Sequence, residues 1–203
     1  MIIAITDRKI SAKHEFLEQI EEIANGSPDM IILREKDLSE PEYRHLAVEC
    51  ARICGYHNVD FCVNTFIKTA QHINNGRIQI SFGSLTANAK MLKEFDEVWV
   101  SVHSLEEAVE AKRIGATHLI FGNVFETSCK PGAEGKGLKE LADVCRAVDI
   151  PVFAVGGIDI VNSPMVMETG CAGICIRSLL MGSGNPAETI LFLRRGLGEE
   201  NKN

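Results

Sequence analysis

Short apolar runs alternate with longer amphipathic stretches along the whole chain. Eight of the runs have the length of a strand, and most are apolar at every position, which is typical of parallel strands covered on both faces. The stretches between them combine spaced apolar positions with polar faces, as surface helices do. The strands are expected at residues 2–6, 30–34, 60–64, 77–80, 97–102, 118–122, 151–156 and 173–177.

The stretches between the expected strands carry helix-start signals. Ser39–Glu42 and Ser104–Glu107 have the spacing of a capping box, in which a hydroxyl residue is followed three positions later by a glutamate. Asp159 is expected to cap a helix over 160–169, and a last helix is expected over 186–195. Strands and helices therefore alternate from one end of the sequence to the other.

Eight successive strand–helix units predict an α/β fold, a single closed (β/α)8 barrel of the TIM type. The rival fold is an open doubly wound sheet, which usually has five or six strands. Residues 182–187 superficially match a glycine-rich dinucleotide motif, but no strand and no suitably spaced acidic residue follow them. We therefore expect one barrel domain over 1–197 and a polar tail over 198–203.

Composition narrows the function classes. The 203 residues carry a net charge of −7, which argues against a surface for duplex nucleic acid but leaves room for a small anionic ligand. The seven cysteines are odd in number and include no Cys-x-x-Cys pair, so we expect small buried hydrophobes in a reducing compartment. No apolar run approaches the ~20 residues of a membrane span, and the start does not resemble a signal peptide. We expect a cytoplasmic protein with no membrane partner.

The candidate site residues come from the expected strand ends, because barrels of this type build their sites at the carboxyl ends of the strands. Gly156 and Gly157 follow the seventh strand, and Arg177 and Ser178 follow the eighth, the two positions that frequently form a phosphate site. Polar residues also end the earlier strands, namely Arg34, Lys36, Asn64, Ser101 and His103.

The longest connection, 123–137, follows the sixth strand and is rich in glycine and charged residues. A loop of this length in a compact barrel is expected to act as a lid over the site. Within it, Thr127 and Lys130 offer a hydroxyl and an ammonium group to an anionic ligand.

These motifs resemble the thiamine phosphate synthase/TenI superfamily over about residues 1–195. The resemblance rests on Arg-Glu-Lys at 34–36, Asn64, the run Ser-Val-His-Ser-Leu-Glu-Glu-Ala at 101–108, the lid sequence at 121–130 and Gly-Gly-Ile at 156–158. It implies a TIM barrel that binds a thiazole phosphate, a small phosphorylated heterocycle of thiamine biosynthesis. In the TenI branch it also implies a homodimer or higher homo-oligomer.

Departures from the synthase pattern favour the TenI branch. Synthases join a pyrimidine diphosphate to the thiazole phosphate and release magnesium-bound pyrophosphate. This chain has Thr65 in place of their metal-binding aspartate, no carboxylate in the turn 81–85, Ile32 in place of a glutamine and Cys129 in place of a second lid threonine. Carboxylates are the oxygen ligands that Mg²⁺ prefers. We therefore expect no metal or other cofactor, and a TenI-like thiazole tautomerase, an isomerase that aromatises a carboxythiazole phosphate by a proton shift.

The resemblance also implies roles for individual residues. In the TenI branch the acid/base is a histidine after the sixth strand. This chain has Asn123 at that position, and an amide cannot carry a proton. His103 is the candidate replacement base, and Lys130 completes the expected catalytic set. The expected substrate-binding residues are Arg34, Lys36, Asn64, Ser101, Thr127 and Cys129. Two alternatives stay open: a thiamine phosphate synthase, and a non-catalytic regulator that binds a thiazole or thiamine phosphate.

Overall fold

The eight strands form a closed parallel barrel in sequence order, which confirms the predicted (β/α)8 fold. The computed structural model describes residues 1–11, 15–127, 132 and 134–198. Every strand lies within two residues of its expected position. The strands are β1 (Ile2–Ile5), β2 (Met30–Leu33), β3 (Asp60–Asn64), β4 (Arg77–Ser81), β5 (Glu97–Val102), β6 (His118–Gly122), β7 (Val152–Val155) and β8 (Gly173–Ile176).

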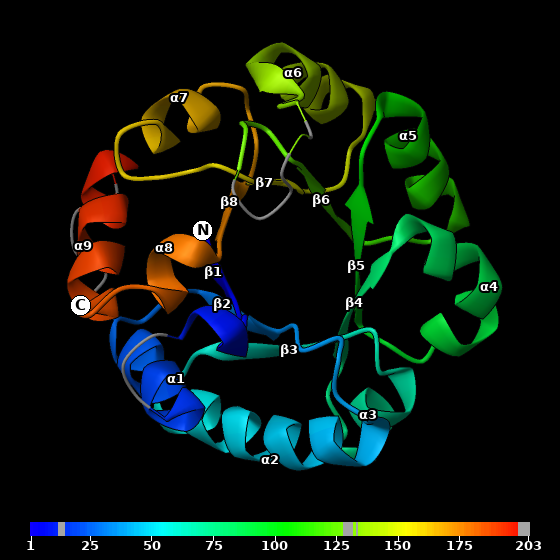
Figure 1. Ribbon diagram of the computed structural model, residues 1–203. Coiled ribbons are helices and arrows are strands. Elements are labelled where there is room, and N and C mark those ends of the chain that lie inside the picture. Colours follow the sequence, from blue (N-terminus) through cyan, green and yellow to red (C-terminus); the bar gives the residue numbers. More distant parts are fainter. Residues whose placement is uncertain (12–14, 128–131, 133, 199–203) are drawn as a thin grey trace.

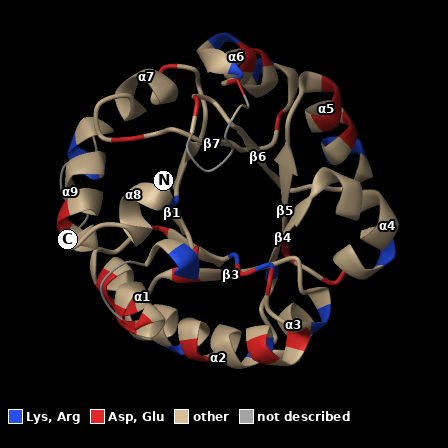
Figure 2. Cartoon of the chain, viewed as in Figure 1, with Lys and Arg blue, Asp and Glu red and all other residues tan. Residues whose placement is uncertain are grey.

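The helices surround the barrel as an outer ring (Figure 1). A short α8 lies inside this ring, between α9 and β1 (Figure 1). The helical elements are η1 (Arg8–Ile10), α1 (Phe16–Asn25), α2 (Glu40–Tyr56), α3 (Ile67–His72), α4 (Phe82–Leu92), α5 (Leu105–Ile114), α6 (Gly137–Ala147), α7 (Ser163–Met167), α8 (Ser178–Met181) and α9 (Pro186–Gly196). Asp and Glu residues lie mainly on outer helices, among them α1, α2 and α5 (Figure 2).

Two apolar layers hold this arrangement together. The larger layer lies between the strands and the helices, and includes Ile31, Leu33 and Val63. A smaller cluster fills the inside of the barrel, and its members include Ile32 and Trp99. Successive side chains of a strand point to opposite sides of the sheet, so each apolar strand supplies both layers. This explains why the strands are apolar at consecutive positions.

The helix expected over 160–169 is much shorter in the structure, where α7 covers only Ser163–Met167. The Asp159 carboxylate accepts hydrogen bonds from the backbone N–H groups of Val161 and Asn162, at 2.8 and 2.9 Å. Asp159 therefore closes a turn ahead of the helix, and proline in the first turn of α7 fits the later start.

The described cysteines match the expectation of small buried side chains. Six cysteines are described as free thiols, and all of them except the half-buried Cys145 are buried. Burial raises the pKa of the Cys54 thiol to about 12 and that of Cys145 to about 11.

Among the described residues, no helix has the length and apolar character needed to cross a bilayer. Cys129 and the tail residues 199–203 lie outside the described residues. The cytoplasmic location stays a prediction.

His118 makes the stability of the barrel dependent on pH. Its ring stacks on Trp99 at the amino-terminal end of the barrel, with 4.1 Å between ring centroids, and burial lowers the pKa of His118. The unfolded chain therefore binds a proton more readily than the folded one, so stability is full above about pH 6.5 and falls as the pH drops. Urea unfolding at about pH 7.5 and about pH 5.5 should show a larger loss for the natural chain than for His118→Gln. Equal losses would contradict this account.

Candidate active site

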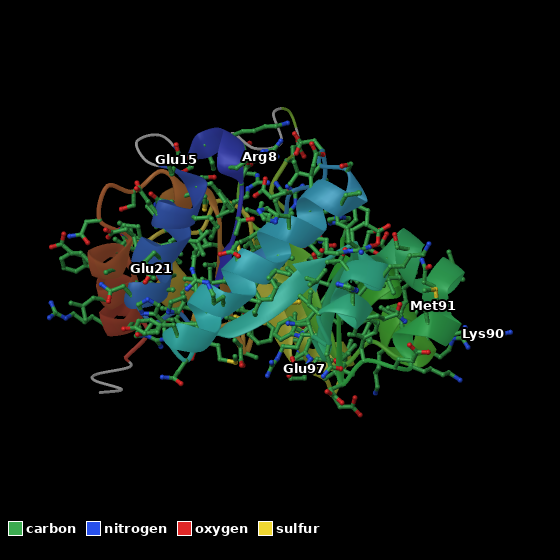
Figure 3. The ribbon with its side chains drawn as sticks, turned by 90° about the horizontal axis from the view of Figure 1, so that it is seen from below. Arg8, Glu15, Glu21, Lys90, Met91 and Glu97 are labelled. Carbon is green, nitrogen blue, oxygen red and sulfur yellow. The ribbon has the colours of Figure 1, made fainter. Side chains whose placement is uncertain are left out.

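A cavity of about 590 Å³ opens at the carboxyl ends of the strands. Each strand, or the segment that directly follows it, contributes to the wall. Figure 3 shows the barrel from the side, with the carboxyl ends of the strands toward the top. Arg8, just after β1, lies at the upper rim, and Glu97, the first residue of β5, lies at the opposite end. The volume is typical of a small-molecule pocket, and the mouth of the barrel is where such enzymes place their sites.

The cavity brings together nearly all of the expected site residues. Cys129 and Lys130 lie outside the described residues, so their roles stay predictions. The expected residues that line the cavity are Arg34, Lys36, Asn64, Ser101, His103, Asn123, Thr127, Gly156, Gly157, Arg177 and Ser178.

Gln79 also lines the cavity and is absent from the expected set. On β4 the flanking Ile78 and Ile80 pack in the outer layer, so Gln79 points into the barrel. The same alternation places Arg34 inward, two positions beyond the interior residue Ile32. A polar residue between two isoleucines is the signal that could have identified Gln79.

Asn64, Gln79 and Ser101 form a polar chain across β3, β4 and β5, in which Asn64 and Gln79 are buried and Ser101 is half-buried. The Asn64 amide donates to the Gln79 side-chain oxygen, and the Gln79 amide donates to the Ser101 hydroxyl at 2.8 Å. The backbone N–H of Asn64 donates to the Tyr43 hydroxyl at 2.9 Å, and that hydroxyl donates to the Leu33 carbonyl at 2.6 Å. These bonds hold one wall of the cavity as a neutral, hydrogen-bonding surface.

A second network holds the segment after β2. The Thr6 hydroxyl donates to the buried carboxylate of Glu35 at 2.7 Å and accepts from the backbone N–H of Arg34 at 2.8 Å. Arg8 bonds Asp37 through two guanidinium nitrogens, at 2.6 and 2.9 Å, and holds the pKa of that carboxyl well below its usual range. Arg8 also contacts Glu35 at 3.2 Å. The start of this segment, at Arg34, is thereby tied to β1.

Replacing Thr6 by valine tests this network. Valine keeps the shape but removes the hydroxyl, which leaves the Arg34 N–H and one Glu35 oxygen without this partner. We expect a loss of about 1–3 kcal/mol in the free energy of unfolding, measured by urea denaturation. The matched control is Thr86→Val, on the exposed surface of α4, which should change stability by less than about 0.5 kcal/mol. Similar losses in both variants would contradict the assignment.

His103 is held at the end of β5 by two contacts. Its ring Nδ1 lies 2.6 Å from the Gly122 carbonyl oxygen, and its backbone N–H donates to the Glu107 carboxylate at 2.7 Å. Since a carbonyl oxygen only accepts, Nδ1 carries the proton, and in the neutral ring Nε2 is the accepting nitrogen. Ser104 caps α5 as expected, through its hydroxyl and the Glu107 N–H.

Asn123 is buried and holds the base of the expected lid. Its side-chain amide donates to the Phe125 carbonyl at 3.1 Å, and its backbone carbonyl accepts from the Lys136 N–H at 2.9 Å. The Val124 N–H donates to the Val155 carbonyl at 2.9 Å, which extends the contact between β6 and β7 beyond the strands. Both ends of this loop are therefore fastened to the barrel.

Gly156 and Gly157 have backbone angles that favour glycine, with φ of 102° and 66°. A Cβ atom on Gly156 would lie 2.4 Å from the Cβ of Asn123, and one on Gly157 would lie 2.5 Å from the carbonyl oxygen of Glu126. The glycines thus allow the loop after β6 to pack against the end of β7. Arg177 and Ser178 line the same part of the cavity, and the Arg177 guanidinium lies 3.9 Å from Asp7.

Comparison with known proteins assigns the family. The family model for thiamine monophosphate synthase matches residues 2–180. The chain belongs to the thiamine monophosphate synthase family. It is 33% identical over 181 residues to a thiamine-phosphate synthase from Clostridium acetobutylicum, covering 88% of this chain and 86% of the relative. A thiamine-phosphate synthase from Pyrococcus abyssi is 30% identical, over 98% and 95% of the two chains. The solved thiamine phosphate pyrophosphorylase from Pyrococcus furiosus superimposes with a TM-score of 0.85 at 28% identity, over 98% and 95% of the chains.

These relatives overturn the expected thiazole tautomerase and the assignment as an isomerase. Relatives that match at about 30% identity over most of their length are named thiamine-phosphate synthases, which favours the transferase. The role of His103 as a replacement base, and that of Asn123 in the family acid/base position, belong to the proton shift and are withdrawn with it.

The oxygen donors in the cavity do not fit the magnesium ion that the resemblance implies for a synthase. Glu126 and Asp159 are the carboxylates among the described lining residues, and they follow β6 and β7. The described residues contain no group of three His, Cys, Asp or Glu side chains placed to hold a metal ion. Thr65 directly follows β3 and Ser84 lies in the first turn of α4, and both offer neutral hydroxyls where Mg²⁺ prefers carboxylate oxygens. Neither residue is among the described residues that line the cavity.

Proposed function

We propose that this chain is a thiamine-phosphate synthase, a transferase that couples a pyrimidine carried as its diphosphate to a thiazole phosphate. The bond between the diphosphate oxygen and the exocyclic carbon of the pyrimidine breaks, and the diphosphate leaves with its electron pair. The thiazole nitrogen supplies the electron pair of the new carbon–nitrogen bond. The products are thiamine phosphate and pyrophosphate, so atoms and charge balance without a further reactant.

The observation that carries the proposal is a single cavity with anion-binding residues on both sides of β1. Arg34 and Lys36 follow β2, whereas Gly156, Gly157 and Arg177 follow β7 and β8. Both substrates carry phosphoryl groups, and each set of residues suits one of them. In this arrangement the thiazole phosphate lies against the glycines and Arg177, and the diphosphate lies against Arg34 and Lys36.

The polar chain on β3–β5 completes the proposed pyrimidine site. Asn64, Gln79 and Ser101 offer amide and hydroxyl groups, which can both donate to and accept from a nitrogen heterocycle. Their mutual hydrogen bonds fix the rotamers in advance, so binding a ring against them costs little conformational entropy. Thr127 lines the cavity from the loop after β6 and would contact the reacting phosphates. The contact of Lys130 with the same phosphates stays a prediction from the sequence.

Incubating the purified chain with both substrates tests the proposal. We expect thiamine phosphate to form, as separated by chromatography, and none to form when either substrate is omitted. The Arg52→Gln variant, altered on the outer face of α2, should retain the natural rate. If both substrates bind but no thiamine phosphate appears, the transferase proposal fails.

A further inference from the structure

We propose that this cavity binds the diphosphate through the protein's own cations, Arg34 and Lys36, and needs no divalent metal ion held by carboxylates. The inference rests on the proposed synthase function, because that function supplies the diphosphate. Its basis is the distribution of charge among the described residues that line the cavity. The cations Arg34 and Lys36 follow β2, whereas the carboxylates Glu126 and Asp159 follow β6 and β7.

The carboxylates of the cavity wall lie away from the two cations. Glu126 follows β6, which is diametrically opposite β2 in a closed barrel of eight strands. Asp159 follows β7, and its carboxylate already accepts two backbone hydrogen bonds within its own turn. Among the described lining residues, a diphosphate held at Arg34 and Lys36 would therefore meet cations without a carboxylate pair beside it.

The carboxylates closest in sequence to these cations are engaged elsewhere. Glu35, between Arg34 and Lys36, points out of the barrel and bonds Thr6 and Arg8. Asp37 bonds Arg8 and lies 3.0 Å from the ammonium group of Lys9. Neither Glu35 nor Asp37 is among the described residues that line the cavity.

Thr65, directly after β3, and Ser84, in the first turn of α4, provide hydroxyls that are already hydrogen-bonded to neighbours. The Thr65 hydroxyl donates to the Asn64 side-chain oxygen at 3.0 Å, and the Ser84 hydroxyl lies 2.9 Å from that of Ser81. These groups are neutral and cannot replace the charge of carboxylates around Mg²⁺. The counter-charge for a diphosphate at this side of the cavity is therefore supplied by Arg34, whose planar fork suits phosphoryl oxygens, and by Lys36.

Calorimetric titration with inorganic pyrophosphate tests the inference directly. In excess EDTA we expect the natural chain to bind pyrophosphate, and added magnesium chloride should not tighten binding. Arg34→Gln should weaken binding about 10- to 100-fold, the size of a lost charge-assisted hydrogen bond, whereas Arg52→Gln should not change it. Binding that appears only with magnesium, or that survives Arg34→Gln unchanged, would overturn the inference.

A paired substitution provides the reverse experiment. Thr65→Asp with Ser84→Asp introduces two carboxylates, and Thr65→Asn with Ser84→Asn is the neutral control of the same shape. Asp and Asn both tolerate the φ of 70° at position 65 better than threonine does. In EDTA the aspartate pair should bind pyrophosphate at least about tenfold more weakly than the asparagine pair, and magnesium should restore only the former. A magnesium gain in the asparagine pair would contradict the proposal.

Failure of this inference can be distinguished from failure of the proposed function. Thiamine phosphate formation that is abolished by EDTA, together with magnesium-dependent pyrophosphate binding, would overturn the inference and leave the synthase proposal intact. Pyrophosphate binding in EDTA without any thiamine phosphate formation would overturn the synthase proposal and leave the cation site intact.

Discussion

Replacing Gly156 with alanine is expected to lower the free energy of unfolding by about 2–4 kcal/mol and to abolish product formation. The new Cβ would lie 2.4 Å from the Cβ and 2.7 Å from the Cα of Asn123, and φ at this position is 102°. Both the loop after β6 and the end of β7 must shift to relieve this contact. Since both segments line the cavity, the loss of stability and the loss of activity have one cause.

Gly55→Ala is the matched control, because an added Cβ at this position in α2 meets no atom within 4 Å and the backbone is helical. Alanine in a helix is more favourable than glycine by about 0.5–1 kcal/mol, so this variant should be slightly more stable and fully active. Urea unfolding and the chromatographic assay of thiamine phosphate formation together provide the comparison. A Gly156→Ala variant with natural stability would show that the contact with Asn123 is not required.

Replacing Arg177 with glutamine is expected to raise the KM for the thiazole phosphate about 100-fold, or ~2.7 kcal/mol, with little change in the affinity for pyrophosphate. Arg177 follows β8, beside the two glycines, and its guanidinium is the cationic group of that part of the cavity wall among the described residues. Glutamine retains hydrogen-bonding capacity but removes the charge. The effect should therefore fall on one substrate only.

The specificity of this effect is measured by varying each substrate separately in steady-state assays. Arg195→Gln, on the outer surface of α9, should leave both KM values unchanged. An equal rise in both KM values after Arg177→Gln would show a general disturbance of the cavity, and no rise would remove Arg177 from the phosphate site.

Most of the barrel could be predicted from sequence because its strands are covered on both faces. Continuous apolar runs such as Ile2–Ile5 and Met30–Leu33 are typical of parallel strands covered on both faces, and eight of them alternating with helical stretches favour a barrel over an open sheet of five or six strands. The helix after β7 was predicted too long, since the same residues that would begin it form the turn closed by Asp159. Such competition between a turn and a helix depends on local hydrogen bonds that the apolar pattern does not encode.

The candidate site could be predicted where residues follow a strand, and less well where they lie within one. Arg34 and Arg177 are found by counting strand ends, whereas Gln79 requires the inward side of β4 to be known. The link from Thr6 to Glu35 joins residues 29 positions apart and has no sequence signature. The expected homodimer and the roles of Lys130 and Cys129 stay predictions.

The prediction of the TenI branch was wrong because it relied on a few motif positions and not on similarity over the whole chain. Thr65, Ile32 and Cys129 depart from the synthase motifs, and each departure changes a local group. Similarity over nearly the full length instead places the chain with proteins named thiamine-phosphate synthases. The metal-binding positions can therefore differ within one overall scaffold, which makes the origin of the counter-charge a question for experiment.

The most direct test of the central claim is a single-turnover reaction with the pyrimidine diphosphate labelled with ¹³C at its exocyclic carbon, followed by NMR. The account predicts that the labelled carbon becomes bonded to the thiazole nitrogen, with one pyrophosphate released for each thiamine phosphate formed. Release of pyrophosphate without the new carbon–nitrogen bond, or no change in the labelled carbon when both substrates are bound, would contradict it.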